Sequence, residues 1–330
     1  MKPSPLNTLL DRLVLPGMAT FTNLGYRVRS RDFAPNDTDM TGRTVVITGA
    51  TSGLGRVAAE AIAGLGATTV IVGRSADKAE HARTEIVAMT GNDDVAVELA
   101  DLSLVAEVRS LGERLLSDHP EIHVLINNAG GLFNPRRETS EGIELTLATN
   151  LLSGFLLTNM LLGRMKDSQP SRIINVSSGG MYTQGISLSN LQFTEGDYSG
   201  AKAYARTKRG QVILTGLWAE MLKGSGVVAN AMHPGWAATP GVDASLPGFG
   251  KFMGPLLRTP EEGADTIVWL ATSPEAEELS GGFFLDRAPH ETHVLPHTKA
   301  DRRKRLELWK ALADLSGWDG PGPIGVEDLS

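Results

Sequence analysis

From Thr44 onward, short runs of β-branched residues alternate with amphipathic stretches of helical period, and this alternation constrains the fold most. The predicted strands are Thr44–Thr48, Thr68–Val72, Val95–Leu99, His123–Ile126, Arg172–Val176, Val227–Met232 and Gly282–Leu285. The predicted helices are Leu54–Leu65, Asp77–Thr90, Leu104–Asp118, a long one through Asn150, Ala203–Leu222 and Pro260–Thr272. Strands that alternate with helices form crossover units and therefore a parallel sheet. We predict an α/β fold of about seven strands with helices on both faces of the sheet.

A glycine-rich loop follows the first predicted strand and opens a helix. Its sequence is Thr48-Gly49-Ala50-Thr51-Ser52-Gly53-Leu54-Gly55. Glycines let the backbone turn tightly and approach a pyrophosphate, and the helix N-terminus offers N–H donors and partial positive charge. A loop of this kind after the first strand is typical of a Rossmann-type, doubly wound nucleotide-binding sheet. We expect the cofactor-binding residues of this loop to be Gly49, Thr51, Ser52, Gly53, Leu54 and Gly55.

The second predicted strand ends in Gly73-Arg74 rather than in an acidic residue. An acidic side chain near this position usually accepts a hydrogen bond from the ribose 2′-hydroxyl of NAD. A guanidinium instead suits a 2′-phosphate, because it brings charge and paired donors. The sequence therefore favours NADP(H) over NAD(H). A solvated surface arginine is the alternative interpretation of Arg74.

Polar residues also gather where later strands end. Asn127-Asn128-Ala129-Gly130 closes the fourth predicted strand, and Ser177-Ser178-Gly179-Gly180 closes the fifth. Asn150 lies inside a long helix, where asparagine is unfavourable by propensity, so a buried polar role is favoured over a solvent-facing one. Ligands of open α/β sheets bind at the carboxyl ends of the strands. We expect these residues to share one site.

Two Tyr-x-x-x-Lys pairs follow, Tyr198 with Lys202 and Tyr204 with Lys208. Residues four apart share one face of a helix. An ammonium beside a phenol lowers the pKa of that phenol toward neutral pH, so the phenol can exchange a proton with an alcohol or carbonyl oxygen. Tyr198 lies among turn-forming residues, whereas Tyr204 and Lys208 precede an apolar helical run. A rigid helix holds a catalytic pair better than a loop does, and this favours Tyr204.

The ordered set of these motifs resembles the short-chain dehydrogenase/reductase family in its single-domain form. The likeness runs from about Gly42 to Leu285 and includes the glycine loop, Asp101-Leu102, Asn127 to Gly130, Asn150, Ser178, Tyr-x-x-x-Lys and Pro234-Gly235 with Thr239. In fine detail the chain is similar to the branch called dehydrogenase/reductase member twelve. The stretches that carry this likeness include Tyr204-Ala205-Arg206-Thr207-Lys208-Arg209 and Met232-His233-Pro234-Gly235-Trp236.

This resemblance implies a role for each matching residue. Tyr204 would be the general acid/base, Lys208 would lower the pKa of Tyr204 and bind the nicotinamide ribose, and Ser178 would hold the substrate oxygen. Asn150 would anchor a water that links Lys208 to solvent. The implied cofactor groove contains, besides the glycine loop, Asp101, Leu102, Asn128, Ala129, Gly130, Pro234, Gly235 and Thr239. The implied reaction interconverts an alcohol and a carbonyl with a nicotinamide cofactor.

One departure from many relatives is the distance of 26 residues between Ser178 and Tyr204, which retinol-dehydrogenase-like members share. The extra chain, Met181 to Ala203, should border the substrate pocket. Trp236, Met181, Tyr182 and Phe252 suggest an apolar pocket, but they fit a core equally well. We therefore expect a lipophilic substrate and leave its identity open.

Residues 42–290 form the predicted dehydrogenase domain, flanked by an N-terminal arm (1–41) and a C-terminal extension (291–330). Around Leu306, Trp309 and Leu312 the extension is amphipathic, which predicts packing on the core or on a second subunit of a homo-oligomer. The arm carries leucines at helical spacing but neither a long apolar run nor a clear cleavage site, so we expect no signal peptide. This helix packs on the protein or, alternatively, lies on a membrane surface.

Composition excludes several functions. The chain has no cysteine, which rules out disulfides and thiolate metal sites and fits a cytoplasmic protein. A net charge of −7 without a basic patch argues against nucleic acid. His290, His293 and His297 have a ligand-like spacing, but Pro296 interrupts the helix that such a set would need, so we expect no metal.

Two other functions compete with the dehydrogenase. A sugar-nucleotide epimerase or dehydratase on a related fold is disfavoured by the glycine spacing and by the lack of a larger C-terminal substrate domain. A non-catalytic NADP(H)-binding regulator or scaffold would have no use for a tuned phenol, so the set of Asn150, Ser178, Tyr204 and Lys208 argues against it.

Overall fold

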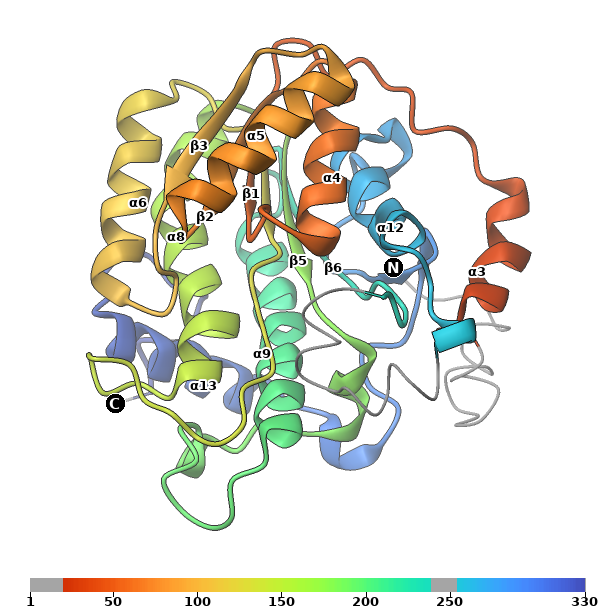
Figure 1. The fold of residues 1–330 in the computed structure, drawn as a ribbon. Helices are drawn as coiled ribbons and strands as arrows, with labels where there is room; N and C mark the ends of the chain where they lie inside the picture. The colour runs from red at the N-terminus through yellow and green to blue at the C-terminus, as the bar shows by residue number, and fades with distance from the viewer. Residues whose placement is uncertain (1–19, 239–253, 330) are drawn as a thin grey trace.

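The centre of the molecule is one eight-stranded sheet in the order β3-β2-β1-β4-β5-β6-β7-β8, in a computed structural model that describes residues 20–238 and 254–329 (Figure 1). The strands are β1 Thr44–Thr48, β2 Thr68–Gly73, β3 Val95–Leu99, β4 Val124–Asn127, β5 Ser171–Val176, β6 Val227–Met232, β7 Phe283–Leu285 and β8 Ala288–Pro289. All pairs from β3 to β7 are parallel, and β8 is antiparallel to β7. The predicted doubly wound α/β fold is confirmed.

The expectation of about seven strands misses β8. This two-residue strand folds back on β7 through Asp286 and Arg287, which both adopt positive φ (52° and 57°). Neither residue is a glycine or asparagine, the types that most often signal such a turn. Pro289 is tolerated there because β8 is an edge strand.

Helices cover both faces of the sheet (Figure 1). The main helices are α3 Asn23–Arg29, α4 Gly53–Gly64, α5 Ala76–Thr90, α6 Val105–Asp118, α7 Leu145–Leu147, α8 Ser153–Asp167, α9 Gly200–Met221, α12 Pro260–Thr272 and α13 Arg302–Ser316. Short helical turns lie at Ser30–Asp32, Ala148–Leu152, Gly179–Thr183, Leu188–Asn190, Gly254–Leu256, Pro274–Ala276 and Pro296–Thr298.

Local sequence explains several helix ends. The Ser75 side chain accepts a hydrogen bond from Lys78 N at the start of α5, and α5 ends at Gly91 in the left-handed region (φ 70°). At the start of α12, Thr259 and Glu262 form a capping box, and Pro260 occupies the first helical position. These caps satisfy N–H groups that have no partner inside the helix.

Two hydrophobic layers hold the helices on the sheet. On one face α4, α5 and α12 pack through residues such as Ile62, Ile86 and Trp269. On the other face α6, α8 and α9 pack through residues such as Leu111, Phe155 and Leu217. The strands β1, β2, β4, β5 and β6 are largely buried from both sides, which explains why they are nearly continuous apolar runs in the sequence.

Among the described residues, one helical stretch is long and apolar enough to cross a membrane. It spans Leu145–Asp167, and 78% of its most apolar window is buried inside the molecule. Polar residues such as Asn150, Ser153 and Asn159 interrupt the apolar residues of this stretch. Its packing between α6 and the sheet accounts for its apolar composition.

Both ends of the described chain pack on the sheet domain. Helix α13 buries Leu306, Leu308, Trp309 and Leu312 against α8 and α9. The Trp309 ring lies edge-on to Phe155 and to Trp218, with centroid distances of 4.9 and 6.1 Å. The leucines of the predicted N-terminal helix, Leu6 to Leu13, lie outside the described residues.

Candidate active site

The carboxyl ends of the parallel strands bring the predicted site residues to one edge of the sheet. Gly49 follows β1, Arg74 follows β2, Asp101 follows β3, Asn128 follows β4 and Ser178 follows β5. Helix α9 runs beside this edge and carries Tyr204 and Lys208. Figure 1 shows α9 alongside β5 and β6.

The glycine loop packs directly against the segment after β4. Gly49 and Gly53 have positive φ (65° and 57°), which side chains rarely adopt. A Cβ on Gly55 would lie 2.4 Å from Asn128 Nδ2 and 2.5 Å from Gly49 O, so only glycine fits. Asn128 Nδ2 in turn donates to the carbonyls of Thr48 (2.9 Å) and Gly49 (3.1 Å).

The loop leaves the start of α4 open. Ser52 stands at the N-cap position, and its side chain makes no capping hydrogen bond. The first N–H groups of α4, from Gly53 and Leu54 onward, have no partner within the helix and form a favourable anion site. The Thr51 methyl group packs so closely on Gly73 that a Cβ there would lie 2.4 Å from it.

Arg74 is exposed at the end of β2. No ion pair or hydrogen bond joins its side chain to another residue of 20–238 or 254–329. Arg56, the other basic candidate for a 2′-phosphate, pairs with Glu85 (2.5 Å) and Glu60 (3.2 Å). Asp101 accepts hydrogen bonds from the backbone N–H and hydroxyl of Ser103, at 2.9 and 2.7 Å.

Asn150 lies in a single π-helical turn, Ala148–Leu152, inside the α7–α8 stretch. Its side chain is 1% exposed. Oδ1 accepts from Gly131 N (2.8 Å), and Nδ2 donates to Gly131 O (2.9 Å) and to Thr207 Oγ1 (3.1 Å). The buried polar interpretation of Asn150 is therefore confirmed, and turns of this type occur often at functional sites.

Ser178, Tyr204 and Lys208 come together beside Asn150. The Ser178 hydroxyl and the Tyr204 ring flank Gly180, where a Cβ would lie 3.5 Å from Ser178 Oγ and 3.9 Å from Tyr204 Cε1. The Lys208 Nζ lies 5.5 Å from the centroid of the Tyr204 ring and donates to Val176 O at 2.8 Å. A Cβ on Gly130 would lie 3.1 Å from Asn150 Oδ1 and 3.3 Å from Lys208 Nζ, so Gly130 keeps this space open.

Burial shifts the two titrating groups in a way that differs from the sequence-based expectation. It lowers the pKa of Lys208 to about 7 and raises the pKa of Tyr204, a rise that the nearby Ser178 hydroxyl partly opposes. Desolvation disfavours both the ammonium and the phenolate. In this arrangement Lys208 alone does not lower the pKa of Tyr204 toward neutral pH. A Tyr204 phenolate and a Lys208 ammonium would stabilise each other as a pair.

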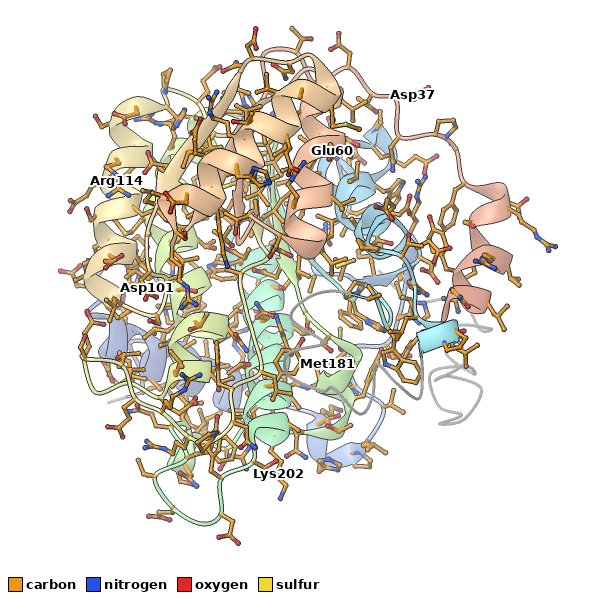
Figure 2. All side chains as sticks on the ribbon, in the orientation of Figure 1. Asp37, Glu60, Asp101, Arg114, Met181 and Lys202 are labelled. Atoms are coloured by element: carbon orange, nitrogen blue, oxygen red, sulfur yellow. The ribbon has the colours of Figure 1, made fainter. Side chains whose placement is uncertain are left out.

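Tyr198 and Lys202 form no comparable pair. Tyr198 precedes α9, and its hydroxyl is hydrogen-bonded to Thr146 (2.9 Å), Phe133 O (3.1 Å) and Glu144 (2.9 Å). Burial is the main cause that raises the pKa of Tyr198 to about 12. Lys202 lies in the first turn of α9 and is exposed at the end of that helix (Figure 2).

The sequence reasoning missed two residues that hold Asn150. Thr207 accepts from its side chain, and Gln211 Nε2 donates to its backbone carbonyl at 3.0 Å. Both lie on the α9 face of Tyr204 and Lys208, three and seven residues beyond Tyr204, so helical spacing could have found them. A small internal cavity of about 10 Å³ below this face is lined by Thr48, Leu102, Asn127, Asn150 and Gln211, among others.

The segment after Ser178 is held by a buried arginine that the sequence reasoning also missed. Arg209 donates to the carbonyls of Met181 (2.7 Å), Gln184 (3.4 Å) and Thr292. Burial lowers the pKa of Arg209 to about 10. Met181 is fully buried against Val212, so of its two interpretations the core one is correct (Figure 2).

The predicted cofactor-binding loop after β6 is described only in part. Gly235 has positive φ (73°), and Pro234 O accepts a hydrogen bond from the Arg258 side chain. Thr239 and Phe252 lie outside the described residues.

No group of three metal-ligating side chains occurs in residues 20–238 and 254–329. His297 Nε2 lies 3.3 Å from Thr183 O, and His290 is buried.

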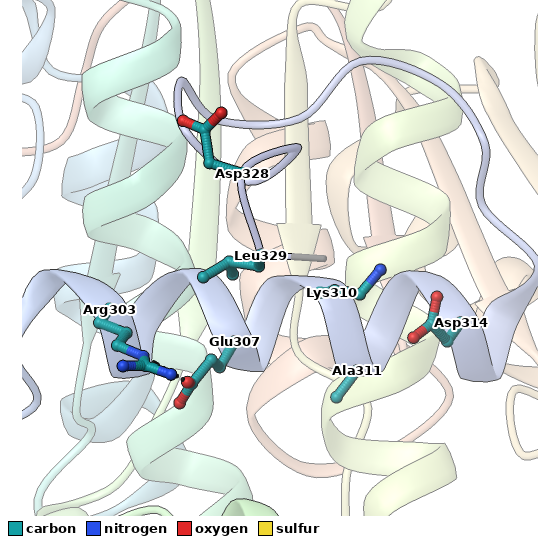
Figure 3. A pocket seen from close by; sticks show the side chains of 7 residues that line it. All are labelled: Arg303, Glu307, Lys310, Ala311, Asp314, Asp328 and Leu329. Carbon is teal, nitrogen blue, oxygen red and sulfur yellow. Dashed lines mark hydrogen bonds and ion pairs between the residues drawn. The ribbon is translucent and has the colours of Figure 1, made fainter.

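A surface hollow of about 560 Å³ lies on the outer face of α13 (Figure 3). Charged side chains such as Arg303, Glu307, Lys310 and Asp314 line it, together with Leu329. None of the predicted site residues contributes to it. This hollow therefore does not belong to the candidate active site.

Comparison with known proteins identifies the kind of site. Residues 43–247 match the family model described as short chain dehydrogenase. The chain belongs to the short-chain dehydrogenase/reductase family. It is 39% identical to dehydrogenase/reductase SDR family member 12 from Bos taurus, over 90% of this chain and 95% of that protein.

A further relative and a solved structure are also similar to this chain. Retinol dehydrogenase 12 from Bos taurus is 38% identical over 85% of this chain and 88% of that protein. The crystal structure of an uncharacterized protein from Mycobacterium paratuberculosis superposes with a TM-score of 0.70 and 29% identity, over 86% of this chain and 97% of that one. The chain is therefore an oxidoreductase that acts on alcohol or carbonyl groups.

Members of this family bind NAD(P)(H), and the residues present fit such a cofactor. The glycines of the loop leave no room for side chains, and the open N-terminus of α4 suits a pyrophosphate. The space kept by Gly130 adjoins Asn150 and Lys208. The favourable anion site at the start of α4 and the Tyr204 group thus lie at the same edge of the sheet.

Proposed function

We propose that the chain is an NADP(H)-dependent dehydrogenase or reductase that interconverts an alcohol and a carbonyl on a lipophilic substrate. The observation that carries this proposal is the grouping of Ser178, Tyr204 and Lys208: Ser178 Oγ and the Tyr204 ring both lie against Gly180, and Lys208 Nζ lies 5.5 Å from the centroid of that ring. Asn150, held by Gly131 and Thr207, borders the same space. The proposal assigns the general acid/base to Tyr204.

The residues around Tyr204 can move a proton at the substrate oxygen. A bound nicotinamide cofactor supplies or accepts the hydride. In carbonyl reduction the Tyr204 hydroxyl donates its proton to the substrate oxygen, and the Ser178 hydroxyl holds that oxygen in place. Lys208, fixed by its hydrogen bond to Val176 O, stabilises the phenolate that remains. The network around Asn150 and Gln211 keeps this helix face rigid.

The preference for NADP(H) rests on Arg74. Its guanidinium is exposed at the end of β2 and has no described partner, so it is available for a 2′-phosphate. Arg56 is neutralised by two glutamates. NAD(H) is the alternative cofactor, and the Arg74 variant described in the Discussion separates the two.

The lipophilic substrate is supported by relatives named retinol dehydrogenase and by aromatic side chains near Ser178. Trp236 follows β6 and packs edge-on against Phe21 at a centroid distance of 5.8 Å. A carbonyl or alcohol on a hydrocarbon chain or ring would match such surroundings. The direction of the reaction in the cell depends on the ratio of cofactor forms.

A non-catalytic cofactor-binding protein is the competing function. The test is to follow the absorbance of NADPH with purified protein and a panel of lipophilic aldehydes and ketones, and of NADP⁺ with the matching alcohols. Turnover that disappears in Tyr204→Phe, while NADPH still binds, supports the proposal. Wild-type protein that binds NADPH but turns over no member of the panel would favour the regulator.

A further inference from the structure

The N-terminal arm is anchored on the sheet domain by one buried arginine. Arg258 is 1% exposed and forms a bidentate ion pair with Asp286, at 2.6 and 3.0 Å. The same guanidinium donates to the backbone carbonyls of Thr20 (2.8 Å), Phe21 (3.1 Å) and Thr22 (3.3 Å). The backbone of residues 20–22 is therefore held in a defined position.

The arm is also tied to the loop after β6. Trp236 N donates to Phe21 O at 2.8 Å. A Cβ on Gly235 would lie 2.2 Å from Arg258 Nε, so glycine at this position is what lets the arginine reach the arm. Pro234 O accepts from the same guanidinium at 3.3 Å. The arm and the Pro234-Gly235 loop therefore form one unit.

This anchoring places the Phe21 ring beside the candidate catalytic residues. A Cβ on Gly179 would lie 3.0 Å from Phe21 Cε2 and 3.1 Å from His233 Nε2. Gly179 directly follows Ser178 and precedes Gly180, where a Cβ would lie 3.5 Å from Ser178 Oγ and 3.9 Å from the Tyr204 ring. Phe21 is partly exposed, and its ring packs edge-on against His233 (4.4 Å) and Trp236 (5.8 Å).

His233 packs against Phe21, and the His233 side chain is uncharged. It is 2% exposed, and its Nδ1 accepts from Gly235 N at 3.0 Å, so the ring proton lies on Nε2. Burial, together with the guanidinium charges of Arg258 and Arg29 and the neighbouring His290, holds the pKa of His233 well below its usual value. The aromatic group around Phe21 therefore stays apolar across the physiological pH range.

We propose that Phe21, supported by Trp236 and His233, is a specificity-determining residue that contacts the apolar part of the substrate next to its reacting carbon. This inference rests on the proposed function, because it assumes a carbonyl held by Ser178 and Tyr204. The arm thereby supplies a wall of the substrate site. The predicted ligand is a carbonyl compound with a hydrocarbon chain or ring that reaches past Ser178.

A comparison of the short substrate propanal with the long substrate decanal measures the contact between Phe21 and the hydrocarbon chain. Removal of the Phe21 ring costs apolar contact with decanal and leaves propanal unaffected. We expect Phe21→Ala to lower the ratio of kcat/KM for decanal over propanal by about tenfold or more, the scale of hydrophobic discrimination in enzyme pockets. Phe21→Leu, which keeps an apolar side chain, should lower the ratio less.

Phe33→Ala is the matched control. Phe33 is another aromatic residue of the arm, but its ring packs under the Arg287 guanidinium at 4.4 Å and edge-on to Tyr26 at 6.1 Å. We expect this variant to keep the wild-type ratio. A ratio for Phe21→Ala that stays within about twofold of wild type, or that rises, in protein whose Tm matches Phe33→Ala, would overturn the proposal.

A binding measurement without turnover separates this proposal from the proposed function. Decanamide carries the same chain and an amide carbonyl that the enzyme does not reduce. By calorimetry in the presence of NADPH, we expect wild type and Phe33→Ala to bind decanamide about tenfold or more tightly than Phe21→Ala does. Equal binding, or no binding to wild type, would contradict the role of Phe21. Binding that depends on Phe21 in a protein without turnover would contradict only the proposed reaction.

Discussion

The Lys208 ammonium nitrogen lies 5.5 Å from the centre of the Tyr204 ring, on the same face of α9, and donates to Val176 O. This relationship joins α9 to the end of β5, two residues before Ser178. It also buries a lysine whose pKa falls to about 7. No carboxylate of residues 20–238 or 254–329 pairs with Lys208, and a buried lysine of this kind is costly for folding, a cost that is typical of functional sites.

Lys208→Met should therefore stabilise the protein while it destroys activity. The folded pKa of Lys208, about 7, lies below its unfolded value of 10.5, so the unfolded chain binds more protons between these values. The buried charge of Lys208 thus lowers the free energy of unfolding by on the order of 5 kcal/mol at pH 7 and below. The hydrogen bond from Lys208 to Val176 O offsets part of this cost. Stability should rise with pH through this window.

Melting curves from pH 6 to pH 10 test this prediction. We expect a higher Tm for Lys208→Met than for wild type at pH 6 to 7, and a difference that shrinks toward pH 10. Lys202→Met, at the exposed lysine of the second pair, should leave Tm and activity unchanged. A Tm for Lys208→Met below that of wild type at pH 6 would show that burial of this lysine carries no such cost.

The pH dependence of the reaction should differ between its two directions. Burial raises the pKa of Tyr204, so the phenol stays protonated through the neutral range. Reduction needs the protonated phenol, and its kcat/KM should hold through neutral pH and fall only in alkaline solution. Oxidation needs the phenolate, and its kcat/KM should rise as the pH increases. Profiles with the same trend in both directions would contradict the assignment of Tyr204.

Arg74→Ala should weaken the preference for NADPH over NADH. A charge-assisted bidentate contact to a phosphate contributes about 1.5–3 kcal/mol, which corresponds to roughly tenfold to hundredfold in the ratio of kcat/KM values. Arg83→Ala is the control, because Arg83 is a partly exposed arginine on α5 that pairs with Glu80. Steady-state kinetics with both cofactors decide the question. A preference that Arg74→Ala leaves unchanged would remove Arg74 from the cofactor site.

Arg209→Lys should loosen the segment that follows Ser178. Arg209 bonds the carbonyls of Met181, Gln184 and Thr292, and a lysine cannot reproduce these contacts because it lacks the planar fork. Buried carbonyls without donors cost about 1–3 kcal/mol each. We expect a lower Tm and a raised KM for the carbonyl substrate, with the Kd for NADPH within about twofold of wild type. Wild-type KM in a folded variant would show that Arg209 does not position the substrate segment.

Much of the fold follows from local sequence patterns. Buried parallel strands are continuous apolar runs, so the bounds of β1 and β6 were predicted to the residue, and the Thr259-Pro260 start marks α12. Contacts between distant segments leave no such pattern. The Arg258 side chain donates to the carbonyls of Thr20 to Thr22, more than two hundred residues away in the sequence. No residue pattern near either segment predicts that contact.

The candidate site, like the fold, could be predicted from the sequence only in part. The geometry brings Asn150, Ser178, Tyr204 and Lys208 together, as the order of the motifs implies, because parallel strands end at one edge. The π-helical turn at Asn150 was not predicted, since its residues also suit a regular helix. The direction of the Tyr204 shift was wrong because the sequence shows the neighbouring charge of Lys208 but not the depth at which both groups are buried.

The choice between the two tyrosines tests the central claim most directly. Tyr204 meets Ser178 and Lys208, whereas the Tyr198 hydroxyl is taken up by Thr146, Glu144 and Phe133 O. The measurement is kcat for Tyr204→Phe and Tyr198→Phe beside wild type, with NADPH binding measured in each protein. We predict that Tyr204→Phe lowers kcat by at least about a hundredfold with the cofactor still bound, the scale of general acid–base catalysis, and that Tyr198→Phe costs much less. An active Tyr204→Phe protein and an inactive but folded Tyr198→Phe protein would contradict the account.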